Sequence, residues 1–129
     1  MEPKWLTVPM VKGLHLLSIA AAGGAAGIRD EGLLQSAIDA PRNLYSYGDN
    51  PSIQDLAAHY CVGIIGNHPF LDGNKRAGIL ATAVFIDLNG FLFRPDEAEG
   101  ARIVISLAAG EIEERLFGGW VSDFTIRKS

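Results

Sequence analysis

The segment from Ile79 to Leu88 constrains the fold more than any other part of the chain, because it is apolar on almost every side. A helix that is hydrophobic all round has to be surrounded by other elements. Asn89 and Gly90 follow it, and both residue types commonly end a helix in the left-handed conformation. The segment therefore predicts a buried helix at the centre of an all-α bundle.

The segments before it predict three of the surrounding helices. The first is expected between Thr7, a capping residue, and Gly23–Gly24. A second, short helix is predicted from Asp30 to Pro41, and a third opens with Asn50–Pro51 as its cap and first residue. The predicted inner stripe of the first helix is Met10, Leu14, Leu17 and Ala21, and that of the third is Ile53, Leu56, Ala57, Tyr60 and Ile64.

The C-terminal part predicts an edge strand at Phe91–Phe93 and two more helices. One starts after Pro95–Asp96 with acidic residues in its first turn, which suits the helix dipole. Its predicted inner stripe is Ala98, Ala101, Ile105 and Ala108. The last helix starts near Glu111, and Arg127–Ser129 is expected to be a loose tail. The fold prediction is a compact single-domain bundle of about six helices.

One connecting segment, Arg42–Asn50, allows two interpretations. Its tyrosines at positions 45 and 47 alternate and it ends in Gly48-Asp49-Asn50, which is compatible with a small hairpin or an ordered loop. It can equally be a simple connection whose tyrosines rest on the core.

Composition limits the classes of protein to which the chain can belong. Hydrophobic residues make up 48% and charged residues 20% of its 129 residues, as in ordinary globular proteins, and the length predicts one domain over residues 1–129. The net charge of −4 argues against direct nucleic-acid binding. No stretch approaches the roughly 20 apolar residues of a membrane span, and no signal peptide is evident. A single cysteine, Cys61, fits the reducing cytoplasm, which is the expected location.

The polar run that leads into the central helix, from His68 to Gly78, carries the strongest functional signal. A loop that feeds a helix start presents free backbone N–H groups and the positive end of the helix dipole. Gly73 would let a ligand approach the backbone, and Asp72 or Asn74 can cap the helix. Lys75 and Arg76 are unfavourable in a first helical turn unless an anion lies beside them. The pattern therefore predicts a phosphate site.

Two further groups complete a reactive set in the same run. His68 can act as a general base near neutral pH. Asp72 offers the kind of oxygen ligand that Mg²⁺ accepts together with phosphate oxygens. Base, metal ligand and cationic anion site are the groups that phosphoryl transfer needs. The other histidines are interpreted differently: His15 as a half-buried structural residue and His59 as a surface residue.

The run HPFLDGNKR resembles the Fic/Doc motif, HxFx(D/E)(A/G)N(G/K)R, and within that family the death-on-curing (Doc) branch. The segments Gly27–Leu34 and Asn89–Gly90 also fall where many Doc-like chains carry similar residues. The resemblance implies roles for the motif residues: His68 as the base that deprotonates a target hydroxyl, Asp72 as the ligand of nucleotide-bound Mg²⁺, Gly73 and Asn74 as the anion hole, and Lys75 and Arg76 as phosphate ligands. It also implies that Arg42–Asn50 is a flap that holds the target protein.

The same resemblance implies a function. Doc members of the family use ATP to phosphorylate a threonine of elongation factor Tu, which halts translation, and a partner antitoxin restrains them. Fic members that transfer AMP generally read HPFx(D/E)GNGRxxR, whereas this chain has Lys75 in the glycine position and Ile79 in place of the second arginine. These changes favour transfer of the γ-phosphate. AMP transfer and a degenerate antitoxin-binding module are the alternatives.

Two positions depart from the Doc pattern. Gly66 lies two residues before the motif histidine, where many relatives have arginine, and Ala77 replaces a common hydroxyl residue. Neither change removes one of the implied roles.

Overall fold

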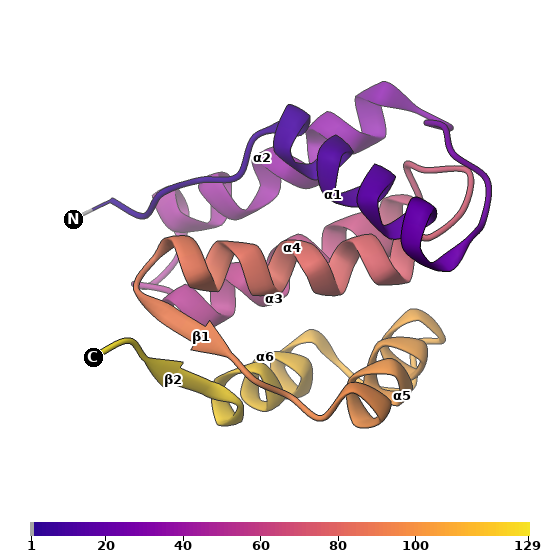
Figure 1. Ribbon diagram of the computed structural model, residues 1–129. Helices are drawn as coiled ribbons and strands as arrows, with labels where there is room; N and C mark the ends of the chain where they lie inside the picture. The colour runs from indigo at the N-terminus through magenta and orange to yellow at the C-terminus, as the bar shows by residue number, and fades with distance from the viewer. Residues whose placement is uncertain (1) are drawn as a thin grey trace.

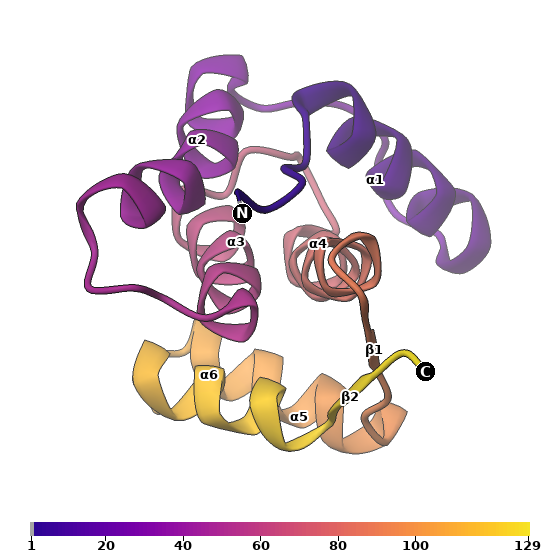
Figure 2. The same ribbon diagram turned by 90° about the vertical axis from the view of Figure 1, so that its left-hand side faces the viewer.

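Six helices and two short strands follow one another in the computed structural model, which describes residues 2–129 (Figure 1). In chain order they are α1 (Val8–Ala22), α2 (Glu31–Tyr47), α3 (Ile53–Asn67), α4 (Asn74–Leu88), β1 (Phe91–Phe93), α5 (Glu97–Ala108), α6 (Glu114–Asp123) and β2 (Thr125–Arg127). The predicted all-α architecture is confirmed. The helices form three layers: α1 and α2 cover one side of the α3–α4 pair, and α5 and α6 cover the other (Figure 2).

The middle pair of helices forms the core. On α4, the residues Ala77, Gly78, Ala81, Thr82, Phe85 and Ile86 are buried, and on α3 the residues Leu56, Ala57, Ala58, Tyr60, Cys61 and Ile64 are buried. The two helices approach closely, since a Cβ atom on Gly78 would lie 3.0 Å from Cys61 Sγ. The buried hydroxyl of Thr82 donates to the carbonyl of Ala57 on α3 at 2.9 Å. The predicted central position of this segment is therefore confirmed.

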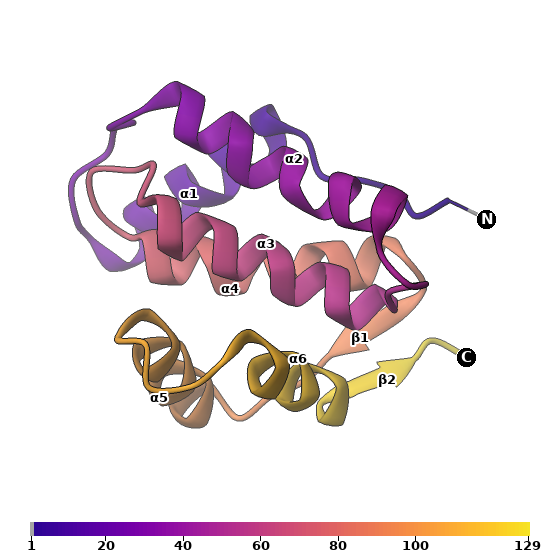
Figure 3. The ribbon, with the colours of Figure 1, turned by 180° about the vertical axis from the view of Figure 1, so that it is seen from behind.

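Helix α2 is longer than the sequence predicts. It continues through Pro41 to Tyr47 and lies along α3 as one continuous helix (Figure 3). Pro41 is buried on the same stripe as Leu34, Ala37 and Ile38, so packing against α3 compensates for the backbone hydrogen bond that proline removes. The expected end at Pro41 is therefore wrong. The hairpin predicted over Arg42–Asn50 is also wrong, because Arg42–Tyr47 is helical and offers no strand edge to a target.

Helix α3 also begins later than predicted. Asn50 and Pro51 precede the helix, and Ser52 is its N-cap. The Ser52 hydroxyl accepts from the Asp55 N–H at 3.0 Å, and the Asp55 carboxylate accepts from the Ser52 N–H at 3.1 Å. This reciprocal capping box satisfies two donors, which a cap at Asn50 would not do.

The inner faces predicted for α1 and α5 are both wrong. The buried residues of α1 are Val11, His15 and Ser18, while Leu17 is 70% exposed. Those of α5 are Gly100 and Val104, while Ile105 is 55% exposed. Part of each predicted stripe, including Leu17 and Ile105, instead borders a groove that is described below.

The C-terminal residues are ordered by pairing rather than loose. Strand β2 pairs antiparallel with β1, with Phe91 opposite Arg127 and Phe93 opposite Thr125. Lys128 forms an ion pair with Asp87 at 2.9 Å. His59 is likewise not a free surface residue, because its Nδ1 lies 2.7 Å from Glu114 on α6. Within residues 2–129, no helix is both long enough and apolar enough to cross a membrane.

Candidate active site

The predicted site residues come together at the junction of α3 and α4. His68 ends α3 in the left-handed conformation, with φ 51°, and its N–H still donates to Ile64 at 3.0 Å. A non-glycine residue in this region is held there by its surroundings. The His68 side chain is exposed and lies on the same groove as Asp72, Lys75 and Arg76.

The backbone of this loop is held by the segment between α1 and α2. The N–H groups of Arg29 and Asp30 both donate to the carbonyl of Pro69, at 2.7 and 3.1 Å. The Arg29 guanidinium donates to the carbonyls of His68 and Asn67, at 2.7 and 2.9 Å. Arg29 therefore fixes the peptides around the left-handed histidine. In the sequence, Arg29 belongs only to the Gly27–Leu34 resemblance, which gives it no role. A cation directly before a helix cap is unfavourable for the helix dipole, which already suggests that its guanidinium binds an acceptor elsewhere.

The side chain of Asn74 has a structural role. It is 6% exposed, and its amide binds both the N–H and the carbonyl of Phe70 at 3.0 Å. The Phe70 ring is fully buried, so this pair anchors the loop to the core. Neither Asn74 nor Asp72 caps α4, because Gly73 is the N-cap at φ 77° and no side chain accepts from the first turn.

Asp72 presents the only carboxylate that the motif contributes to this end of the groove. One oxygen accepts from the N–H of Gly73 at 2.8 Å and the other from the N–H of Ala25 at 3.3 Å. Gly24 is required beside it, since a Cβ there would lie 2.7 Å from the carboxylate. Residues 2–129 contain no cluster of three or more His, Cys, Asp or Glu that could hold a metal. The site therefore fits Mg²⁺ only together with ligands from a nucleotide.

The start of α4 differs from the other helix starts in carrying two cations, Lys75 and Arg76, in its first turn. The N–H groups of Asn74, Lys75 and Arg76 find no acceptor in residues 2–129, whereas α1, α2, α3 and α5 each have a side-chain cap. Helix α6 also lacks a side-chain cap, but its first turn contains the acidic Glu114. Lys75 and Arg76 are exposed and form no ion pair with any residue of that range, and Arg76 only donates to Ser18 at 3.3 Å. Free donors, the helix dipole and two cations are the features that favour an anion at this position.

A groove of about 1060 Å³ extends from the start of α4. Residues of α1, of the first half of α4 and of α5 line it. Figure 1 shows the start of α4 between α1 and α5. Its walls are mainly apolar side chains, among them Leu17, Ala21, Ile79, Leu80, Val104 and Ile105. The groove thus has a polar, cationic end at the motif and a long hydrophobic remainder.

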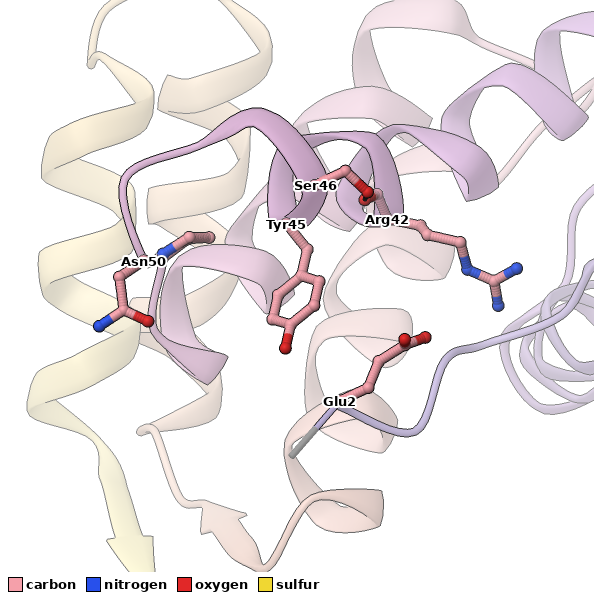
Figure 4. Close-up of a pocket in the computed structure, with 6 residues that line it drawn as sticks. Glu2, Arg42, Tyr45, Ser46 and Asn50 are labelled. Atoms are coloured by element: carbon pink, nitrogen blue, oxygen red, sulfur yellow. Dashed lines mark hydrogen bonds between the residues drawn. The ribbon is translucent and has the colours of Figure 1, made fainter.

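A second hollow, of about 510 Å³, lies at the far end of α2 and is lined by none of the motif residues. Figure 4 shows Tyr45 extending from α2 between Asn50 and Glu2, while the Arg42 guanidinium points aside. That guanidinium lies 5.4 Å from the ring of Trp5. The nearby start of α3 is closed by the capping box of Ser52 and Asp55. The hollow therefore lacks the helix start with two adjacent cations that marks the motif site.

Comparison with known proteins agrees with this geometry. The model of the Fic/DOC family matches residues 5–86. The chain is 35% identical over 77 residues to "Toxin Doc" of Mycolicibacterium smegmatis, a match that covers 59% of each protein. It is 29% identical over 99 residues to "Protein kinase doc" of Escherichia phage P1, covering 77% of this chain and 78% of that protein. The chain thus spans less than two thirds of the mycobacterial protein and over three quarters of the phage protein.

Proposed function

Since this chain belongs to the Fic/DOC family and is of Doc type, we propose that it is the toxin of a toxin–antitoxin pair that phosphorylates a protein hydroxyl with ATP. Elongation factor Tu is the candidate target, and the cytoplasm is the corresponding location. The observation that carries the proposal is the uncapped, doubly cationic start of α4 beside the exposed His68. A phosphate chain supplies the acceptors and the negative charge that these groups lack.

The proposed reaction uses His68 as the general base. Its imidazole takes the proton of the target hydroxyl, the hydroxyl oxygen attacks the γ-phosphorus, and the bond to the bridging oxygen breaks to release ADP. Asp72 would hold the Mg²⁺ that, when bound, neutralises charge on the phosphates. Gly73 leaves space beside the phosphates, Asn74 contributes its backbone N–H, and Lys75 and Arg76 balance the charge of the transferring group.

The identity of the transferred group follows from two positions. Lys75 fills space that a glycine would leave for a phosphate in an AMP-transferring site. Ile79 lies half-buried in the groove wall, where an arginine three residues after Arg76 would clamp a second phosphate. These positions favour a nucleotide whose γ-phosphate faces the target hydroxyl.

The test is a pair of parallel reactions with purified protein, Mg²⁺ and elongation factor Tu. One contains ATP labelled at the γ-phosphate and the other ATP labelled at the α-phosphate. We expect label in protein only from the γ-position, and none with His68→Ala. Label only from the α-position would establish AMP transfer instead. No label from either position in a lysate of the host, together with no growth arrest on expression, would leave the degenerate binding module.

We infer that the antitoxin covers the groove between α1 and α5. Leu17 and Ile105 expose 70% and 55% of their surface on its two sides, which is costly in water and favourable against an apolar segment. An acidic group on that segment would pair with Lys75 or Arg76 at the motif end. The name of the mycobacterial relative, a toxin, supports the existence of a restraining partner.

Co-expression with neighbouring reading frames tests this partner. The cognate antitoxin should restore growth and raise the melting temperature of the toxin by mass action. Ile105→Asp should abolish this protection while the toxin still arrests growth. Leu116→Asp is the matched control, because Leu116 is also 55% exposed but lies on α6 outside the groove. Equal loss of protection in both variants would contradict the groove as the binding surface.

A further inference from the structure

His15 is a buried polar residue of α1 that contacts the motif loop from behind. It is 2% exposed, and its Nε2 lies 2.7 Å from the backbone oxygen of Asp72, 57 residues away in the chain. Its ring is stacked on that of Phe70, with centroids 3.8 Å apart and planes 5° from parallel. A carbonyl oxygen only accepts, so Nε2 carries the proton of this bond.

The bonded carbonyl belongs to the peptide that joins Asp72 to Gly73. In a trans peptide the C=O and the N–H point in opposite directions, so holding the carbonyl inward turns the Gly73 N–H outward. There it donates to the Asp72 carboxylate at 2.8 Å. Gly73 is at φ 77°, and glycine tolerates both signs of φ, so the backbone alone does not prevent this peptide from flipping. The hydrogen bond from His15 therefore holds the Asp72–Gly73 peptide in one orientation.

Among residues 2–129, His15 is the one side chain that forms a hydrogen bond to the Asp72 carbonyl. A Cβ on Gly73 would lie 3.6 Å from His15 Nε2 and 3.3 Å from Ile19 Cδ1, so the turn rests directly on these two residues of α1. Ile19 has no polar group. No other side chain in residues 2–129 donates to the Asp72 carbonyl.

We propose that His15 is a positioning residue that fixes the Asp72–Gly73 peptide and thereby aims the Asp72 carboxylate at the groove beside the start of α4. It lies behind the loop, so it touches neither nucleotide nor target. The step from carboxylate to Mg²⁺ and ATP rests on the proposed function, whereas the orientation of the peptide does not. If His15 only stabilised the fold, its ring stacked on Phe70 would be sufficient and the hydrogen bond to the Asp72 carbonyl would not matter.

Three variants separate the hydrogen bond from the stack. His15→Gln keeps an N–H donor at the same number of bonds from Cβ as Nε2 but loses the ring. His15→Asn carries the same amide one bond shorter and cannot reach the carbonyl. His15→Phe keeps the ring without a donor. If the phenylalanine variant does not fold, the glutamine and asparagine variants still form a matched pair that differs in reach alone.

The first readout needs no ligand. The Gly73 amide should give one ¹H–¹⁵N resonance in the wild type and in His15→Gln, and a shifted, broadened or doubled one in the asparagine and phenylalanine variants. The second readout is titration with Mg·ATP, in which affinity should fall about tenfold or more in those two variants and stay within about threefold in His15→Gln. Unchanged Gly73 resonances in His15→Asn, or a glutamine variant that behaves like it, would overturn the proposal. A wild type that neither binds Mg·ATP nor transfers phosphate would refute the proposed function, while the Gly73 resonances would still decide the role of His15.

Discussion

The α3–α4 pair and the α1–α5 pair contain similar apolar residues but use them differently. Leu56 and Ile86, on the first pair, are fully buried. Leu17 and Ile105, on the second pair, are 70% and 55% exposed and both line the groove. The middle layer therefore supplies stability, and the flanking helices expose apolar surface that a partner can cover. Substitutions in the two pairs should have effects of different kind as well as size.

The largest expected contrast is between Ile86→Asp and Leu17→Asp. The first places an unpaired carboxylate in the core, at a cost comparable with the whole stability of about 5–15 kcal/mol that a domain has. It should prevent soluble folding. The second places the charge in water and should keep wild-type helicity and a cooperative melt. Circular dichroism and thermal melting of both variants check this, and a cooperative melt of Ile86→Asp would disprove the central position of α4.

A second contrast removes side chains instead of adding charge. Leu56→Ala leaves a cavity between α3 and its neighbours and should cost about 2–5 kcal/mol. Ile105→Ala, on an exposed face, should change the free energy of unfolding by less than about 0.5 kcal/mol. Urea titrations measure both. A cost above about 2 kcal/mol for Ile105→Ala would mean that α5 packs through its outer stripe after all.

This contrast also explains which parts of the fold could be predicted. The segment Ile79–Leu88 is apolar on almost every side, so any fold has to bury most of it, and its predicted central place is confirmed. On α1 and α5 the hydrophobic period identifies a stripe but not what covers it. A stripe that lines a groove has the same pattern as one in the core, which is why Leu17 and Ile105 were assigned to the interior.

The same limit applies to the ends of helices and to the site. Pro41 stops a helix in isolation, and only packing against α3 shows that it does not do so here. At the site, the run from His68 to Arg76 predicts a phosphate site because its residue types are close in sequence. The roles of His15 and Arg29 depend on contacts across long loops, for which a single sequence gives no distance.

Alkaline pH should act on the middle pair. Burial raises the pKa of Cys61 from 9.0 to about 12, and burial raises the pKa of Tyr60 from 10.0 to about 12. The unfolded chain therefore loses these protons first, so stability is fully present below about pH 9 and falls as pH rises toward 12. Urea unfolding between pH 8 and 11 should show this decline, with a smaller slope in Cys61→Ala. The control is Tyr47→Phe, which removes a hydroxyl from a side chain that is 75% exposed. An equal slope in Cys61→Ala and the wild type would contradict the assignment.

The smallest expected effect concerns how α1 is attached. Helix α1 packs on the core through a narrow stripe of buried residues. It is also joined to α2 by an ion pair between Lys12 and Glu31 at 2.9 Å. The two side chains are 37% and 64% exposed. Water and salt screen such pairs, and the two long side chains lose conformational freedom when they meet. A double-mutant cycle with Lys12→Gln and Glu31→Gln should therefore give a coupling energy below about 1 kcal/mol that disappears in 1 M NaCl. A coupling energy above about 1.5 kcal/mol that persisted in salt would contradict this expectation. The ion pair would then fix α1 to α2, and the groove that α1 borders would be more rigid than the exposure of Leu17 implies.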